Sequence, residues 1–219
     1  MKRPLVLAHR GACWDAPENS LPAFELAVEE GSDYVEFDVR LDASGRLVLC
    51  HDPVPDPCPP ELAMLDEALE ALRGRVGSAV EIKEEAAADA VLRALRAHRI
   101  PAAELMILSF ELRTLEIVRR ARTDVRVVLN LGLRPDPAAG GRYWGVGFDD
   151  RATKPKPIRL AHSLGLAVLV FTVNEPGRMR ELAALGVDGI FSDRPGLLRE
   201  TLSALPETGR ERSRKGNSR

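Results

Sequence analysis

Short apolar runs alternate with amphipathic segments along most of this chain, and the alternation limits the folds open to it. Nine runs have the length and composition of strands. They are Leu5–His9, Tyr34–Leu41, Leu47–His51, Ala79–Lys83, Leu105–Ser109, Val125–Leu129, Gly145–Phe148, Ala167–Val173 and Asp188–Ser192. Helices are predicted at Ser20–Glu30, Glu61–Arg73, Ala86–His98, Glu111–Ala121, Ile158–Leu164, Arg178–Leu185 and Leu197–Leu205. Strands that alternate with helices predict βα units and a parallel sheet.

The second and third predicted strands are an exception to this alternation. Only residues 42–46 separate Tyr34–Leu41 from Leu47–His51. A parallel crossover needs about a dozen residues or more, whereas a short linker containing Ser-Gly favours a hairpin. We therefore predict an antiparallel hairpin in which Leu41 faces Arg46. In that register Glu36 faces His51.

The remaining eight strands predict a (β/α)₈ barrel. With 219 residues, the chain is a short version beside the ~250 typical of this fold. A doubly wound open sheet has the same alternation, but no Gly-rich phosphate loop follows the first strand. We predict one barrel domain over residues 1–205 and a disordered basic tail over residues 206–219. Asn130–Tyr143 has no clear period and predicts a long loop.

Ionisable residues recur toward the C-terminal ends of the predicted strands. Side chains alternate between two faces of a strand, so His9 shares a face with the leucines before it. Glu36 and Asp38 share a face of the second strand, and Glu81 and Lys83 share a face of the fourth. Barrel enzymes have their active sites at the C-terminal strand ends. These side chains are therefore predicted to meet there.

The three carboxylates Glu36, Asp38 and Glu81 would repel one another without a cation. A ligand set made only of oxygens favours a hard divalent ion, Mg²⁺ or Ca²⁺. A divalent metal site is therefore predicted. The Glu-x-Asp spacing is also common by chance on exposed strands, so the prediction rests on the three residues together.

The remaining candidates carry acid–base and anion-binding chemistry. His9 and His51 can act as general acid and base near neutral pH, and Arg10 and Lys83 can bind a phosphoryl group. Each also has a structural alternative. A strand-end histidine is more often structural, and Lys83 could simply pair with Glu81. The set as a whole favours a functional site.

These residues belong to a longer series of motifs. The segments are His9-Arg10-Gly11, Glu18-Asn19-Ser20, Glu36-Phe37-Asp38-Val39, His51-Asp52, Glu81-Ile82-Lys83, Ser109-Phe110, Phe171-Thr172-Val173-Asn174 and residues 186–195. In this order and spacing the chain resembles the glycerophosphodiester phosphodiesterase family, from about residue 4 to residue 198. Each motif alone is weak, but the series is specific.

The resemblance implies a metal-dependent hydrolysis of glycerophosphodiesters to sn-glycerol 3-phosphate and an alcohol. The residues that would match the family's metal ligands are Glu36, Asp38 and Glu81. Those that would match its acid–base pair are His9 and His51, and those that would contact substrate are Arg10, Lys83 and Phe171. The choice between Mg²⁺ and Ca²⁺, the leaving alcohol and the assignment of acid and base stay open. So does the nucleophile, which is water or the neighbouring glycerol hydroxyl.

Three features depart from the usual family pattern. Only Pro53–Pro60 separates the His51-Asp52 motif from the helix predicted to begin at Glu61. Family members usually carry a longer inserted subdomain at this point, so a more open pocket is expected. Phe171 stands where the family usually has Trp, and Ser20 where it often has Thr. Trp144 is either a substitute for the missing indole donor or a core residue. The chain is also short for the fold.

Other functions remain open. A lysophospholipase D or a sphingomyelinase-D-like lyase would use the same site on a lipid substrate, and would need an apolar entry surface. A non-catalytic binding barrel would keep the fold without the reaction, but no expected catalytic residue is missing from the sequence. A small-molecule phosphodiester is therefore the expected partner.

Composition excludes several classes. The net charge of −2 gives no field that attracts nucleic acid. The three cysteines have neither the spacing of a disulfide framework nor that of a zinc site. The apolar run before His9 is too short for a signal peptide or a membrane span. A cytoplasmic protein without a stable membrane anchor is expected, and its oligomeric state is open.

Overall fold

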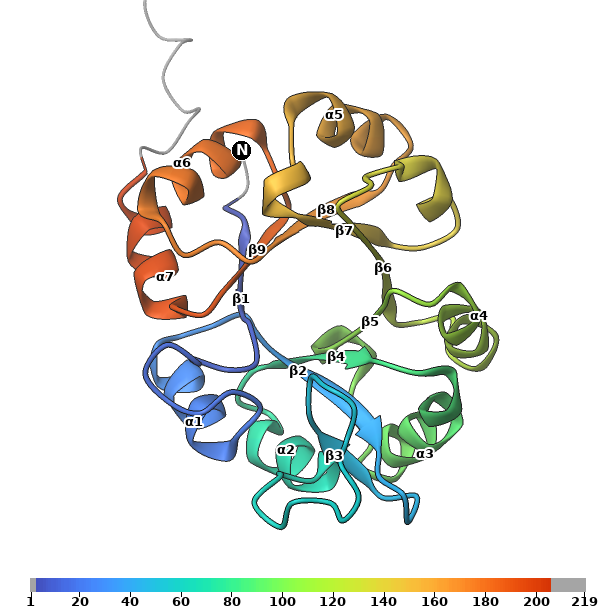
Figure 1. The fold of residues 1–219 in the computed structure, drawn as a ribbon. Helices are drawn as coiled ribbons and strands as arrows, with labels where there is room; N and C mark the ends of the chain where they lie inside the picture. Colours follow the sequence, from blue (N-terminus) through green and yellow to red (C-terminus); the bar gives the residue numbers. More distant parts are fainter. Residues whose placement is uncertain (1–2, 206–219) are drawn as a thin grey trace, which may run out of the picture.

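The computed structural model describes residues 3–205, which form the predicted (β/α)₈ barrel. Eight parallel strands close into a ring because β1 pairs with both β9 and β2. Figure 1 looks along the barrel and shows the helices outside the ring of strands. The predicted tail, residues 206–219, lies outside the described residues, and the single domain over residues 1–205 stays a prediction.

The observed strands agree closely with the predicted ones. They are β1 Leu5–Ala8, β2 Tyr34–Leu41, β3 Leu47–Leu49, β4 Gly77–Ile82, β5 Leu105–Ser109, β6 Arg126–Gly132, β7 Gly145–Asp149, β8 Ala167–Phe171 and β9 Gly189–Ser192. The α-helices are α1 Leu21–Glu29, α2 Leu65–Leu72, α3 Ala88–Ala97, α4 Leu112–Ala121, α5 Pro155–Ser163, α6 Pro176–Leu185 and α7 Pro195–Ser203.

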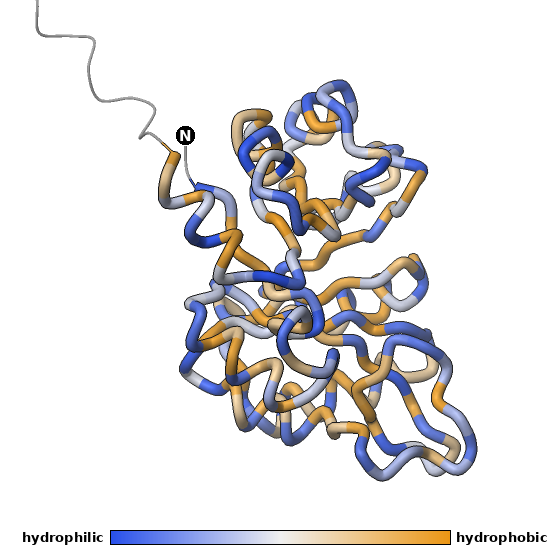
Figure 2. The backbone as a smooth tube through the Cα atoms, turned by 60° about the vertical axis from the view of Figure 1, so that its left-hand side comes forward, coloured by the Kyte–Doolittle hydropathy of each residue, from blue (hydrophilic) through white to orange (hydrophobic). Residues whose placement is uncertain are grey.

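Strand side chains alternate between the barrel interior and the helix layer. In β4, Val80 and Ile82 pack outward against the helices. Figure 2 shows hydrophobic and hydrophilic segments alternating along the chain, as expected for elements with one buried face. The buried interior residues are Leu7, Tyr34, Ala79, Met106, Leu108, Val128, Leu169 and Phe191. These apolar side chains fill the barrel below the polar C-terminal end.

Three helices begin earlier along the chain than predicted. Pro155, Pro176 and Pro195 are the first residues of α5, α6 and α7. A proline at the first position of a helix costs no hydrogen bond, because the backbone N–H that it lacks would have no partner within the helix there. Its fixed φ also suits the helix. In contrast, α2 begins later than predicted, because Met64 pairs with Val48 beside β3.

The predicted hairpin is confirmed, but its register is wrong by one residue. Leu41 pairs with Leu47 rather than with Arg46. The reason lies in the turn, where the Asp42 amide donates to the Arg46 carbonyl (3.0 Å) and Gly45 takes a φ of 83°. The predicted pairing of Glu36 with His51 is therefore not formed, and His51 lies beyond the end of β3.

The predicted loop at Asn130–Tyr143 is partly wrong. Asn130 and Gly132 belong to β6, which continues through an irregularity in its pairing with β7. A short 3₁₀ helix, Pro137–Gly140, replaces the α-helix expected of this βα unit, and Figure 1 shows this small segment between β6 and β7. The missing helix helps to explain the short chain.

No helix within residues 3–205 combines the length and the apolar content needed to cross a membrane.

Candidate active site

A cavity of ≈ 320 Å³ opens at the C-terminal ends of the barrel strands. We call it the central cavity. All eight predicted site residues line it: His9, Arg10, Glu36, Asp38, His51, Glu81, Lys83 and Phe171. A second cavity, of ≈ 430 Å³, lies beside α1 and residues 58–64 and contains none of them. The central cavity is therefore the place where chemistry would occur.

Three carboxylates form one buried group in this cavity. Oxygens of Glu36, Asp38 and Glu81 lie within 4.8 Å of one another. The two glutamates and the aspartate are 3%, 8% and 2% exposed, respectively. They come from neighbouring strands, because β2 and β4 pair with Asp38 opposite Glu81.

Burial makes the charge of this group costly. Burial, with the nearby Asp38 and Glu81 charges, raises the pKa of Glu36 well above its ordinary value. Burial also raises the pKa of Glu81, although Lys83 opposes it. For Asp38 burial acts in the same direction, but Lys83, Asn19 and Arg10 outweigh it and lower the pKa.

The two predicted phosphate-binding cations both contact these carboxylates. Lys83 Nζ lies 2.7 Å from Glu81 Oε1 and 3.2 Å from Asp38 Oδ1. Arg10 Nε lies 3.1 Å from Asp38 Oδ2, and its Nη1 donates to Glu18 at 2.8 Å. The structural alternative for Lys83, a pair with Glu81, is thus formed, and both cations also face the cavity.

Two asparagines support the carboxylates, and neither was among the predicted site residues. Asn19 donates to Asp38 Oδ2 and accepts from the Asp38 amide, both at 3.0 Å. Asn130 Nδ2 donates to Glu81 Oε2 at 3.0 Å. Ser20 is the N-cap of α1. Asn130 directly follows the predicted strand Val125–Leu129, and a polar residue at a strand end is the signal that could have found it.

The two histidines lie at the same cavity in different surroundings. His9 Nδ1 lies 2.7 Å from Asp193 Oδ1, and both side chains are partly buried. His51 Nδ1 lies 2.8 Å from Asp52 Oδ1, but the Asp52 side chain is 85% exposed. The His51 carbonyl accepts from Arg40 Nε at 2.9 Å, which fixes the backbone after β3.

Three phenylalanine rings in the cavity lining form an aromatic wall. The Phe171 ring meets those of Phe110 and Phe191 edge to face, at 6.0 and 6.3 Å. Trp144 does not replace the missing indole. It precedes β7 at the other end of the barrel, where its ring packs 5.2 Å from the Arg126 guanidinium.

The comparisons with known proteins agree with this geometry. The model of the Glycerophosphoryl diester phosphodiesterase family matches residues 9–68 and 75–197. The chain belongs to this family. The sequence-based resemblance and the barrel fold are thereby confirmed.

Individual relatives of this family member are distant or matched only locally. A "Probable glycerophosphodiester phosphodiesterase 1" of Mycobacterium tuberculosis is 55% identical over 49 residues, 22% of this chain and 18% of that protein. A glycerophosphodiester phosphodiesterase of Bacillus subtilis is 21% identical over 249 residues, 89% of this chain and 85% of that protein.

Solved structures share the fold. An Oleispira antarctica phosphodiesterase in complex with the product sn-glycerol-3-phosphate has a TM-score of 0.84 at 24% identity, over 92% of this chain and 98% of that one. A glycerophosphodiester phosphodiesterase from Parabacteroides distasonis has a TM-score of 0.83 at 22% identity, with the same shares covered.

The carboxylates of this family member fit a divalent cation. Three buried oxygen donors within 4.8 Å form the hard ligand set that Mg²⁺ and Ca²⁺ prefer. The three carboxylates also outnumber the two cationic side chains in contact with them, Arg10 and Lys83. A cation at this group would offset the cost of that burial.

Proposed function

We propose that this protein is a metal-dependent glycerophosphodiester phosphodiesterase, releasing sn-glycerol 3-phosphate and an alcohol. The observation that carries the proposal is the meeting of two histidines, three carboxylates and two cations around one cavity in a member of this family. The expected substrate is a small phosphodiester. A cavity of ≈ 320 Å³ is large enough for the headgroup of such a molecule.

Each charged residue has a defined part in the proposed reaction. Glu36, Asp38 and Glu81 would hold the cation, which when bound would act as a Lewis acid on the phosphate and offset its charge. Arg10 and Lys83 would bind the non-bridging phosphate oxygens by charge-assisted hydrogen bonds.

His9 and His51 would divide the proton transfers. One removes a proton from the attacking oxygen, and the other donates a proton to the departing alkoxide. Their pairing with separate carboxylates, Asp193 and Asp52, supports two independent roles. Phe171 would exclude water from one side of the phosphate.

The four histidines of the chain permit a matched test. His9→Ala and His51→Ala are each expected to lower the release of glycerol 3-phosphate from glycerophosphocholine by about 10²- to 10⁴-fold. His98→Ala and His162→Ala also remove an aspartate-paired histidine, but should retain full activity. Equal activity in all four variants would contradict the proposed roles, and binding without release by the wild type would favour a non-catalytic barrel.

A lipid substrate is the second candidate, and exposed apolar residues favour it. Phe110, Leu112 and Leu133 are about half exposed or more, at 50%, 51% and 58%. They lie on the segments that follow β5 and β6, and Phe110 also lines the central cavity. An acyl chain that leaves the cavity would meet this apolar edge, so a lysophospholipase D activity has a surface to use.

A pair of double variants distinguishes the two substrates. Leu112→Ser/Leu133→Ser, which spares the cavity lining, should lower kcat/KM for lysophosphatidylcholine about tenfold or more if the acyl chain contacts this edge, because each buried CH₂ contributes about 0.8 kcal/mol. Hydrolysis of glycerophosphocholine should change little. Leu160→Ser/Leu164→Ser alters exposed leucines at α5 and its end instead. An unchanged preference in the first variant would remove the lipid candidate.

A further inference from the structure

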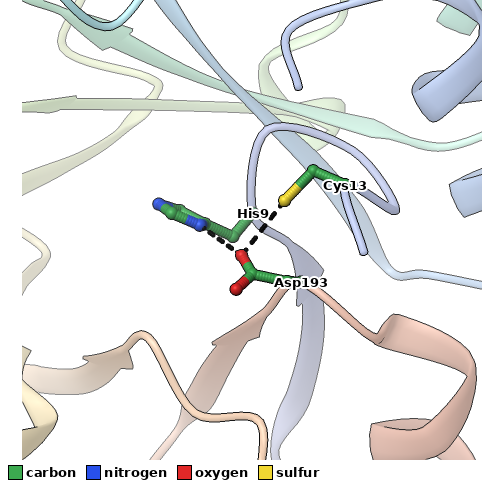
Figure 3. Close-up of side chains that lie close together, drawn as sticks. All are labelled: His9, Cys13 and Asp193. Carbon is green, nitrogen blue, oxygen red and sulfur yellow. Dashed lines mark hydrogen bonds and ion pairs between the residues drawn. The ribbon is translucent and has the colours of Figure 1, made fainter. Parts of the chain in front are cut away.

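Asp193 contacts three polar side chains next to the central cavity. His9 Nδ1 lies 2.7 Å from its Oδ1, and Cys13 Sγ donates to the same oxygen at 3.1 Å. Asn174 Nδ2 donates to the other oxygen, Oδ2, at 2.6 Å. Figure 3 shows Asp193 between His9 and Cys13, with the second ring nitrogen of His9 directed away from the carboxylate.

Residues at or after the C-terminal ends of three strands hold Asp193 in place. Its backbone amide donates to Asn174 Oδ1 at 3.0 Å, so Asn174 bonds both to the Asp193 backbone and to its side chain. Ser192 Oγ donates to the same amide oxygen at 3.0 Å. The Asp193 carbonyl accepts from the Trp14 amide at 3.1 Å. Residues after β1, β8 and β9 thus fix one carboxylate.

The charges of this cluster determine which atoms carry protons. Burial alone would raise the pKa of Asp193, but the bonds from His9, Asn174 and Cys13 outweigh it and lower the pKa to about 2. Burial raises the pKa of the Cys13 thiol, so the thiol remains a donor. An ionised carboxylate only accepts hydrogen bonds, and His9 Nδ1 must therefore bear a hydrogen.

We propose that Asp193, held by Asn174, is a positioning residue that fixes the tautomer and the ring orientation of His9. The proposal rests on the proposed function, in which His9 transfers a proton. With Nδ1–H donated to Asp193, neutral His9 presents an unprotonated Nε2 to the cavity. Nε2 then takes up or returns the proton, while the Nδ1–H bond and the charge on Asp193 stay unchanged.

Asp193→Asn tests the proposal through kinetics. The amide can donate to Nδ1 and so favours the other tautomer. We expect kcat for glycerophosphocholine to fall by about 10²- to 10⁴-fold, the range known when a histidine is held in the wrong tautomer. KM should stay within about threefold, because Asp193 contacts neither the carboxylate group nor the phosphate-binding cations. Asn174→Ala keeps the charge of Asp193 but removes the side chain that holds it, and should lower kcat by about tenfold.

A matched control is available elsewhere in the barrel. Asp188, just before β9, has its Oδ2 atom 3.0 Å from His162 Nε2, and the same oxygen accepts from the Val168 amide at 2.8 Å. Asp188→Asn breaks an equivalent aspartate–histidine pair outside the cavity and should leave kcat within about twofold. A similar fall in kcat in both aspartate variants would mean a structural role alone and would overturn the proposal.

The ring ¹⁵N chemical shifts of His9 give an independent readout in the wild-type protein. At a pH high enough for His9 to be neutral, we expect its proton on Nδ1 and none on Nε2. In Asp193→Asn we expect the proton on Nε2 and none on Nδ1. The opposite tautomer in the wild type overturns the proposal, even where Asp193→Asn does not fold. A wild type without any activity would contradict the proposed function, while the tautomer would still decide the role of Asp193.

Discussion

At the scale of single residues, the site depends on small side chains as well as charged ones. A Cβ added at Gly147 would lie 2.2 Å from Asn130 Oδ1 and 3.1 Å from the Phe171 ring. Gly147 therefore leaves the space in which Asn130 donates to Glu81.

Gly147→Ala is expected to displace Asn130 and to weaken the cation site. We predict a loss of cation affinity of about 10- to 100-fold, as for other groups that orient a metal ligand, and a destabilisation of about 1–3 kcal/mol from overpacking. Calorimetric cation titration and urea unfolding measure the two effects. Gly177→Ala in α6, where no atom lies within 4 Å of the added carbon, is the control. Equal cation affinity in both variants would contradict this role of Gly147.

The sequence revealed the residues that lie on regular strands and follow a period of two. Glu36, Asp38 and Glu81 were predicted to share the cavity, and they do. Asn130 was missed because a bulge extends β6 into a segment without a clear period. Asp193 was present in a motif but had no predicted role. Its contacts join loops after β1, β8 and β9, and their spacing depends on the closed barrel.

At the scale of the elements, one aspartate sets the register of the β2–β3 hairpin. Asp42 Oδ1 accepts from the Ser44 and Arg46 amides at 2.9 and 2.8 Å, and Oδ2 accepts from Arg46 Nε at 2.7 Å. The hairpin was predictable from the linker length. The register was not, because it follows from these turn contacts rather than from the apolar pattern of the strands.

Asp42→Ala should destabilise the protein, and the effect should depend on pH. Burial would raise the pKa of Asp42, but the bonds from Arg46 and Ser44 outweigh it and lower the pKa below its ordinary value. A lowered pKa in the folded state stabilises the protein above the unfolded value of about 3.9, and this stabilisation is lost as pH falls further. Urea unfolding should therefore show a difference from wild type at pH 7 that shrinks below about pH 4.

An exposed aspartate–arginine pair provides the comparison for Asp42. Asp124 pairs with Arg122 at 2.8 Å, but its side chain is 55% exposed. Asp124→Ala should change stability little, because exposed ion pairs contribute about 0–1 kcal/mol. A larger loss in Asp124→Ala than in Asp42→Ala would contradict the view that the hairpin turn matters to the fold.

At the scale of the whole molecule, cation binding should be linked to stability. Mg²⁺ or Ca²⁺ at about 100 times its dissociation constant should stabilise the folded state by about 2.7 kcal/mol, measured as a rise in Tm at pH 7.5. The rise should shrink toward pH 5. Glu36 and Glu81 have raised pKa values, and protons then compete for the same oxygens. Glu36→Gln should abolish it, and an unchanged rise in that variant would place the cation elsewhere.

The barrel architecture was predictable from two observations together. The alternation of strands and helices fits both a barrel and an open sheet, and the lack of a Gly-rich phosphate loop after the first strand favoured the barrel. The absence of an α-helix between β6 and β7 agrees with the predicted loop, although the short 3₁₀ helix there was not predicted. The early starts of α5, α6 and α7 were missed because they depend on local proline geometry.

The central claim is that this cavity hydrolyses glycerophosphodiesters with a divalent cation. The most direct test incubates the wild-type protein with glycerophosphocholine and with glycerophosphoethanolamine, in Mg²⁺, in Ca²⁺ and in EDTA, and measures sn-glycerol 3-phosphate. We predict release in at least one cation, none in EDTA, and recovery when the cation is restored. Folded protein that releases no product in either cation, or releases it equally in EDTA, would contradict the claim.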